Sequence, residues 1–261
     1  MAQIESKLSE SKEKTLALRE LDVSELRSLI SRTAGNSFEL FTDLKKDHPK
    51  IVQALQARGA SAEQAEKEAS INALSLISSY PPTDRASTCT VVFPKALPLG
   101  SVAEKLRSFQ LLYADDEKGR LITKYAAYHE GAHCGQMELL RELGMTTPKT
   151  KFGEALSTAV AEAYSDSLAT LCYLQDAAKL NKAEQEKARI ALSEFTELKH
   201  DNAPLINSLS SKLVTDLLGL PVKQIEIMTD KEMRDFVRKL IIENAQTFME
   251  WLKDATTDSV F

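Results

Sequence analysis

The hydrophobic and polar positions of residues 1–80 follow the period of an α-helix. Apolar side chains recur three and four positions apart, as on one helical face, at Leu18, Leu21, Leu26, Leu29 and Ile30. Asp22 or Ser24 can cap the start of this run, and Ser61 followed by Gln64 is typical of another helix start. We therefore expect a helical N-terminal lobe over residues 1–80.

The pattern changes at Pro81 and Pro82, because two consecutive prolines cannot continue a helix. Residues 88–94, TCTVVFP, are mostly β-branched or aromatic and end at a proline, which favours a short strand. Residues 109–114 read as a second strand, followed by an acidic turn that contains glycine. The sequence thus predicts a small sheet within residues 88–122.

Helical periodicity dominates again from residue 121. The predicted helices cover residues 121–143, 152–179, 182–199, 204–218 and 230–253. The sequence thus predicts a mainly α-helical protein with a small β-sheet, an α+β fold. In it, a core over residues 81–261 follows the N-terminal lobe, with two long helices within 121–179 and a C-terminal helical subdomain over 182–253.

Composition and charge narrow the class of protein. The 261 residues are 43% hydrophobic, enough for a substantial core, and 33 basic against 38 acidic residues give a net charge of −5. We expect no nucleic acid and no membrane as a partner, because basic residues do not cluster and no apolar run approaches the roughly 20 residues of a membrane span.

The polar start of the chain lacks the apolar segment of a secretory signal. We expect a cytoplasmic protein, or one exported by a signal-independent route, for instance a bacterial effector. Three widely spaced cysteines, Cys89, Cys134 and Cys172, form no CxxC pair and are odd in number. We expect all three to be reduced thiols, with Cys134 a packing residue.

The segment HEGAH, residues 129–133, carries the candidate chemistry. On a helix, His129 and His133 share one face, so both imidazoles can bind one ion at about 2.0–2.1 Å. Glu130 points about 100° away from His129, which suits it to take a proton from a water on the metal rather than to be a ligand. A catalytic zinc site then needs a third protein ligand.

Glu162 and Asp166 supply a candidate ligand and its support. They lie four apart in an alanine-rich helix, where an unpaired buried carboxylate is costly. A Zn²⁺ ion explains both acids if Glu162 binds it while Asp166 accepts the outer N–H of a ligand histidine. Without a metal, Glu162 is a solvated surface residue and Asp166 a hydrogen-bond partner for a neighbouring helix.

HEGAH followed by EAYSD resembles the thermolysin-like, glutamate-zincin metallopeptidases, whose signature is HExxH and then ExxxD on the next long helix. The resemblance implies a zincin-like catalytic core in which His129, His133 and Glu162 bind zinc. It makes Glu130 the general base and Asp166 the carboxylate behind a ligand histidine.

A later segment, KHDNAPLIN, is similar to the histidine segment of the same family through His200, Asn202 and Asn207. The resemblance implies that His200 donates a hydrogen bond to the oxyanion of the reaction, with Asn202 a possible substrate contact. Three tyrosines near the motifs could replace His200 as donor, Tyr164 before Tyr128 and Tyr113.

The chain also departs from the family pattern. The gap from HExxH to ExxxD is longer than in thermolysin-like enzymes, and the gap from there to His200 is shorter. Neither residues 88–94 nor residues 109–114 carry the Asn-Ala-aromatic signature of the edge strand that binds substrate. The N-terminal lobe resembles nothing in that family.

The function expected from these motifs is that of a zinc metalloendopeptidase acting on a protein or peptide, with a zinc-bound water activated by Glu130. One alternative is a zinc-binding, zincin-like scaffold without turnover that presents its N-terminal lobe to a partner. A second is a helical protein without metal. The sequence leaves the substrate, the cleavage specificity and the oligomeric state open.

Overall fold

A computed structural model describes residues 17–70, 77–84, 86–98, 107–146, 150–202 and 204–257. These residues form a mainly helical protein with one three-stranded sheet, which confirms the predicted α+β class. No helix among them combines the length and the apolar content that a membrane crossing requires.

The N-terminal segment supplies both helices and strands. Its elements are α2 (Val23–Ala34), β1 (Phe38–Phe41), α3 (Leu44–Ala57), α4 (Ala62–Ala69) and β2 (Ser78–Tyr80). The carboxylate of Asp22 caps α2, and Ser61 with Gln64 forms the capping box predicted for α4. The two strands were not predicted, because helical periodicity dominates the residues around them.

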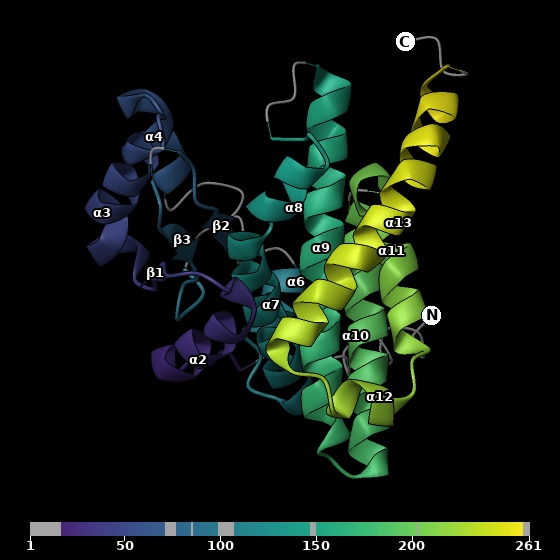
Figure 1. The fold of residues 1–261 in the computed structure, drawn as a ribbon. Coiled ribbons are helices and arrows are strands. Elements are labelled where there is room, and N and C mark those ends of the chain that lie inside the picture. Colours follow the sequence, from purple (N-terminus) through teal and green to yellow (C-terminus); the bar gives the residue numbers. More distant parts are fainter. Residues whose placement is uncertain are drawn as a thin grey trace, which may run out of the picture.

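The sheet has β3 (Cys89–Val92) at its centre, which confirms the strand predicted in residues 88–94. β1 pairs with β3 in parallel, and β2 pairs with it antiparallel on the other side. The proposed boundary between residues 80 and 81 therefore falls inside the sheet. Figure 1 shows the sheet lying between α3–α4 and α7.

The second predicted strand is wrong. Residues 107–112 form a short helix, α6 (Arg107–Leu112), which packs against α7. A brief apolar run such as FQLL does not distinguish a buried helical turn from a strand by periodicity. Here the side chains of Leu112 and Tyr113 are buried, and no described strand pairs with these residues.

The helices after residue 115 follow the prediction closely. They are α7 (Glu117–Gly135), α8 (Met137–Glu142), α9 (Lys151–Ala178), α10 (Lys182–Asn202), α11 (Pro204–Leu218), α12 (Val222–Glu226) and α13 (Asp230–Thr257). The segment predicted as one helix over 121–143 is thus divided at Gln136 into α7 and α8.

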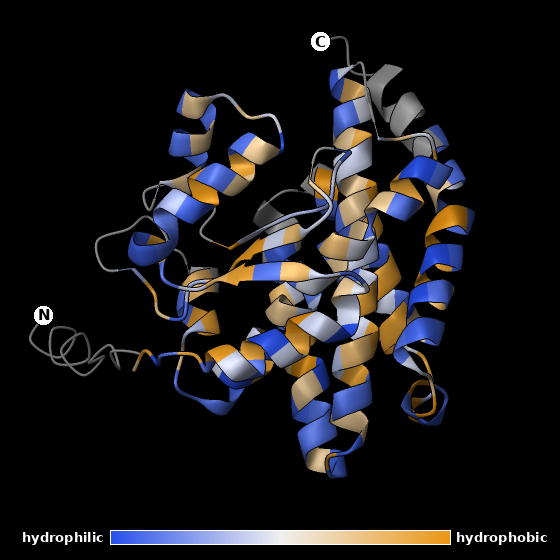
Figure 2. Ribbon diagram, turned by 60° about the vertical axis from the view of Figure 1, so that its left-hand side comes forward, coloured by the Kyte–Doolittle hydropathy of each residue, from blue (hydrophilic) through white to orange (hydrophobic). Residues whose placement is uncertain are grey.

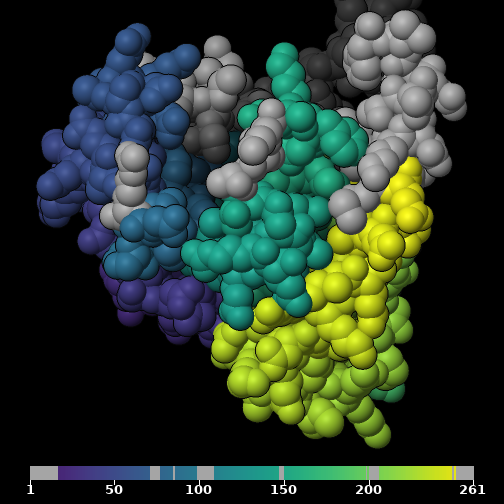
Figure 3. All heavy atoms as spheres, turned by 45° about the horizontal axis from the view of Figure 1, so that its top comes forward, coloured from purple at the N-terminus to yellow at the C-terminus, as the bar shows by residue number. Residues whose placement is uncertain are grey.

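Helix α9 is the central element of the molecule (Figure 1). It packs against α7 on one side and against α10, α11 and α13 on others, and most of its side chains are buried. Apolar residues gather on the strands and on the inner faces of the helices (Figure 2). Figure 3 shows α13 lying against the segment that contains α8 and α9, where Arg238 pairs with Glu138 and Glu142.

The prediction of three reduced thiols is wrong for two of them. Cys89, at the start of β3, and Cys134, near the end of α7, form a disulfide. The two residues are far apart in sequence, and neither belongs to a recognisable spacing motif, so the fold alone brings them together. Cys172 on α9 is a buried free thiol, as expected.

Candidate metal centre

The two helices that carry the motifs begin at well-capped residues. The carboxylate of Asp116 accepts a hydrogen bond from the backbone N–H of Gly119 at the start of α7, at 2.6 Å. The hydroxyl of Thr150 accepts one from the backbone N–H of Gly153 at the start of α9, at 3.0 Å. α7 and α9 then pack side by side, so HEGAH faces the acids of α9.

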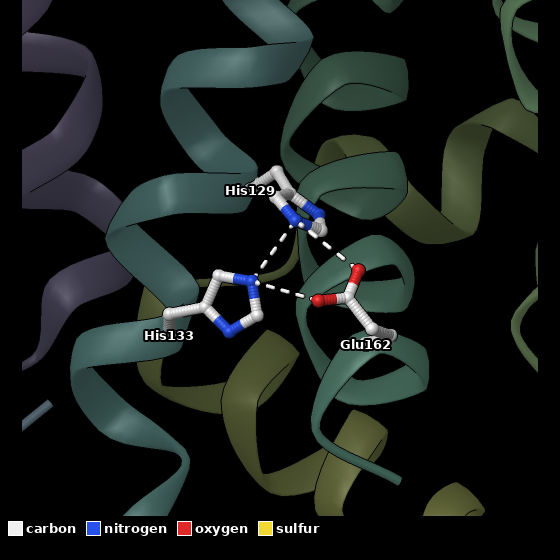
Figure 4. A group of neighbouring side chains, drawn as sticks. All are labelled: His129, His133 and Glu162. Atoms are coloured by element: carbon white, nitrogen blue, oxygen red, sulfur yellow. Dashed lines mark hydrogen bonds and ion pairs between the residues drawn. The ribbon is translucent and has the colours of Figure 1, made fainter. Parts of the chain in front are cut away.

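Figure 4 shows the imidazoles of His129 and His133 and the carboxylate of Glu162 pointing toward one another. Nε2 of His129 lies 3.0 Å from Nε2 of His133 and 3.6 Å from Oε2 of Glu162. Nε2 of His133 lies 3.5 Å from Oε1 of Glu162. These three residues form a group that could hold a metal ion.

The separations within this group are close to those of a tetrahedral metal site. Ligand atoms about 2.0–2.1 Å from a zinc ion, at tetrahedral angles, lie roughly 3.3–3.4 Å from one another. The two imidazole nitrogens are 3.0 Å apart, and the carboxylate of Glu162 presents Oε1 to His133 at 3.5 Å and Oε2 to His129 at 3.6 Å. The side chains are thus already spaced for a small divalent cation.

The outer nitrogen of each histidine lies close to a side-chain oxygen. Nδ1 of His129 lies 2.7 Å from Oδ1 of Asp166, and Nδ1 of His133 lies 2.6 Å from Oε1 of Gln136. In the tautomer in which Nδ1 carries the proton of each ring, the two Nε2 lone pairs face each other. Two lone pairs 3.0 Å apart repel unless a cation or a proton lies between them.

Asp166 is the most enclosed member of the centre, with 1% of its surface exposed. It accepts hydrogen bonds from the hydroxyls of Tyr125, at 2.9 Å, and Ser210. Burial alone would raise the pKa of Asp166, but Lys199 and His129 outweigh burial and hold this pKa well below its usual range. Asp166 is therefore an anion that holds His129 in place.

Lys199 of α10 is a member of the centre that the motifs did not reveal. Its Nζ donates to Oε2 of Glu162 at 2.7 Å and to both oxygens of Asp166 at 2.9 Å. Burial lowers the pKa of Lys199, yet the two carboxylates raise it above its ordinary value. The only signal in the sequence was its place beside His200 in the KHDN segment.

The pKa values of Glu162, His129 and His133 are shifted by burial and by the charged groups around them. Burial would raise the pKa of Glu162, but Lys199 and the two histidines lower it to about 2. Burial and Lys199 lower the pKa of His129, but the carboxylates of Asp166 and Glu162 outweigh them, and the net shift is upward. Burial and the neighbouring His129 lower the pKa of His133, which favours a neutral imidazole.

Glu130 lies beside the metal-binding group without belonging to it. Its buried side chain accepts a hydrogen bond at Oε2 from the hydroxyl of Ser79, at 2.7 Å. Ser79 belongs to β2, and the same hydroxyl lies 2.9 Å from the backbone oxygen of Glu130. Nothing in the sequence around Ser79 pointed to this contact, which depends on the packing of β2 against α7.

Two cavities meet at Glu130 and His129. One, of about 350 Å³, is bordered by His133, Glu162 and Ser79, with further polar side chains from Gln136, Ser157 and Thr158. The other, of about 200 Å³, is largely apolar and is lined by Ile77, Phe109, Leu112, Ala126 and Phe195, with Lys199 at its edge. The candidate base is therefore accessible from both cavities.

Several predicted residues lie elsewhere. His200 and Asn202 belong to the last turn of α10, and their side chains are outside the described residues. Tyr164 is buried, lines neither cavity, and has a pKa raised to about 12 by burial. Asn207 donates to the backbone oxygen of Lys199 at 2.8 Å and so supports the end of α10.

The remaining two tyrosine hydroxyls are bound away from the metal-binding group. Tyr128 donates to Oδ2 of Asp176 at 2.5 Å, and Tyr113 donates to the backbone oxygen of Pro94 at 2.6 Å. Neither residue lines the two cavities beside Glu130. The hydroxyl of Ser79, by contrast, contacts Glu130 directly.

No known protein family, curated protein or solved structure matches this chain. The functional argument therefore depends on the geometry of the centre and on the chemistry of its donors. Two imidazoles and a carboxylate, with a second carboxylate behind one imidazole, are a donor set typical of zinc.

Proposed function

We propose that this protein is a zinc-dependent metalloendopeptidase with a zincin-like core, in which His129, His133 and Glu162 hold the zinc ion. The observation that carries the proposal is that Nε2 of His129, Nε2 of His133 and the Glu162 carboxylate converge, with the nitrogens 3.0 Å apart and each 3.5 or 3.6 Å from one carboxylate oxygen. The resemblance of HEGAH and EAYSD to the HExxH and ExxxD motifs of thermolysin-like enzymes supports the same assignment.

Zinc bound at this position would polarise a carbonyl and lower the pKa of water. Glu130 is the base because it lies beside the ligands, is not one of them, and faces both cavities. It accepts a proton from the attacking water and then donates that proton to the leaving amine. Ser79 holds the carboxylate in place through its hydrogen bond to Oε2.

Strand β2 is suited to bind the backbone of a peptide. It is an edge strand that pairs with β3 on one side, and no other described strand pairs with it. Ser78 and Ser79 of this strand border the cavity above the proposed ligands. A peptide that extends the sheet along β2 would therefore pass Glu130.

The largely apolar cavity beside Glu130 suits one side chain of such a peptide. Its lining includes Phe109, Leu112 and Phe195, and its volume of about 200 Å³ is sufficient for a branched or aromatic side chain. We expect cleavage next to large apolar residues. The polar cavity on the other side of Glu130 would accept a small or polar side chain.

The test combines metal analysis with a proteome-derived peptide library, comparing wild type with Glu130→Gln and His133→Ala. We expect one zinc per chain in wild type and in Glu130→Gln, cleavage only in wild type, and loss of zinc in His133→Ala. Stoichiometric zinc in wild type without cleavage of any peptide would contradict the enzyme and favour a zinc-binding scaffold. Wild-type protein without stoichiometric metal would refute both functions.

A further inference from the structure

Lys199 places a positive charge on the same carboxylates that serve the proposed metal site. Its Nζ lies within hydrogen-bond distance of three carboxylate oxygens, one of Glu162 and both of Asp166. Glu162 is the proposed third ligand, and Asp166 holds the ligand His129. One ammonium group therefore contacts both acids on which the centre depends.

This arrangement explains how two acids remain close together when the metal is absent. Glu162 and Asp166 are one helical turn apart on α9, and both are charged, so they repel each other. The side chain of Lys199 reaches between them from α10. Without its charge, the two carboxylates would have His129 and His133 as their nearest basic neighbours among the described residues.

We propose that Lys199 is a built-in counter-cation that preserves the centre without metal and weakens the binding of metal to it, so that the ion is exchangeable. The inference rests on the proposed function, because it assumes that Glu162 is a ligand. It predicts a protein that folds before it acquires zinc and binds the ion less tightly than its three ligands would otherwise allow.

Two effects of Lys199 oppose each other. By orienting Glu162 and Asp166 it favours the metal, and partners behind ligands are typically worth about 10–100-fold in affinity. By its charge it disfavours the metal, because a monovalent and a divalent cation then share one carboxylate in a site of low dielectric constant. The repulsion between Lys199 and the metal ion is doubled by the two charges of the ion and is only weakly screened. We therefore expect this repulsion to outweigh the gain from orienting the two carboxylates.

The experiment compares Lys199→Met, Lys199→Gln and Lys199→Arg with wild type. The dissociation constant for zinc is measured by competition with a chelator, and the melting temperature of each metal-free protein is recorded. Lys187→Met is the matched control, because Lys187 lies on the same helix but is exposed and pairs with Glu117.

We expect Lys199→Met and Lys199→Gln to bind zinc at least 10-fold more tightly than wild type and to melt several degrees lower without metal. Gln keeps a hydrogen-bond donor while removing the charge, so agreement between these two variants assigns the effect to charge. The dissociation constants of Lys199→Arg and Lys187→Met for zinc should stay within about threefold of the wild-type value.

Equal or weaker zinc binding by the neutral variants, with zinc bound by wild type, would overturn the role of Lys199 and leave the proposed function standing. Absence of zinc binding in every protein would remove the proposed function itself. If the neutral variants fail to fold, the thermal unfolding of metal-free wild type tests whether the centre is preserved without metal. A metal-free wild type without a cooperative thermal transition would contradict the inference.

Discussion

The hydroxyl of Ser79 donates a 2.7 Å hydrogen bond to Oε2 of Glu130. This contact joins the edge strand β2 to the glutamate of HExxH, so the element proposed to bind a peptide also positions the proposed base. Glu130 is buried against the protein on the side of Ser79 and borders the two cavities on the other. The orientation of Glu130 therefore depends on a residue far from it in sequence.

Ser79→Ala should reduce kcat/KM about tenfold while leaving the zinc content unchanged. A hydrogen bond to a charged group contributes about 1.5–3 kcal/mol, and about 1.4 kcal/mol corresponds to a factor of ten in rate. Steady-state kinetics on the best library peptide, with metal analysis of the same samples, measure both quantities. Ser31→Ala is the control, since Ser31 lies on the exposed face of α2, away from both cavities, and donates to the backbone oxygen of Ser28. Unchanged kinetics in Ser79→Ala would remove Ser79 from the mechanism.

The disulfide between Cys89 and Cys134 should stabilise the fold measurably. It closes a loop with a sequence separation of 45, for which the chain-entropy estimate is about 4 kcal/mol. We expect reductant to lower the free energy of unfolding of wild type by about 2–4 kcal/mol in a denaturant titration. The double variant Cys89→Ala/Cys134→Ala should not respond to reductant. A response in the double variant would point to Cys172 or to another cause.

The elements with sustained periodicity were predictable from the sequence. α9, α11 and α13 begin within one residue of their predicted starts, because long amphipathic patterns identify helices well. The strands β1 and β2 were not, since each is only three or four residues long and pairs with β3 from a distant part of the chain. Short strands are fixed by their partners more than by their own residues.

The same distinction applies to the candidate site. His129, His133 and Glu162 were proposed as ligands because helical spacing determines which side chains share a face, and the structure brings them together. Lys199 and Ser79 reach the centre through the packing of α10 and β2 against other elements. No local spacing encodes such contacts, so one sequence could not reveal them.

Gly131, the first variable residue of HEGAH, allows α2 to cross α7 closely. A Cβ atom at this position would lie 2.2 Å from Oγ1 of Thr33 and 2.4 Å from the backbone oxygen of Ile30. Thr33 also donates a 2.7 Å hydrogen bond to the backbone oxygen of Tyr128, which fixes the crossing. The motif is therefore constrained by packing as well as by chemistry.

Gly131→Ala should destabilise the protein by about 1–3 kcal/mol or more, because the backbone of α2 must move to admit the methyl group. Gly135→Ala on the same helix is the control. There the nearest atom would be 3.5 Å from the new Cβ, an ordinary contact, and alanine favours the helix. Chemical denaturation of wild type, Gly131→Ala and Gly135→Ala measures the three free energies of unfolding. Equal stability of the two variants would contradict the close crossing.

Asp176 anchors a polar network near the C-terminal end of α9. Its carboxylate pairs with Arg32 of α2 at 3.1 Å and accepts a hydrogen bond from Tyr128 at 2.5 Å. Burial would raise the pKa of Asp176, but Tyr128 and Arg32 outweigh burial and lower it. Asp176 therefore binds its proton less readily in the folded protein than in the unfolded chain.

Asp176→Asn should lower the free energy of unfolding by about 1.5–3 kcal/mol at pH 7, the size of one hydrogen bond to a charged group. A carboxyl group with a depressed pKa stabilises the fold above its unfolded pKa of about 3.9, and loses that effect as the pH falls through the folded value. The stability difference between wild type and Asp176→Asn should thus shrink below about pH 4. Urea unfolding between pH 7 and pH 3 measures the difference, with Asp216→Asn as an exposed control. A difference that stayed constant over this range would show that Asp176 contributes no proton-linked stability.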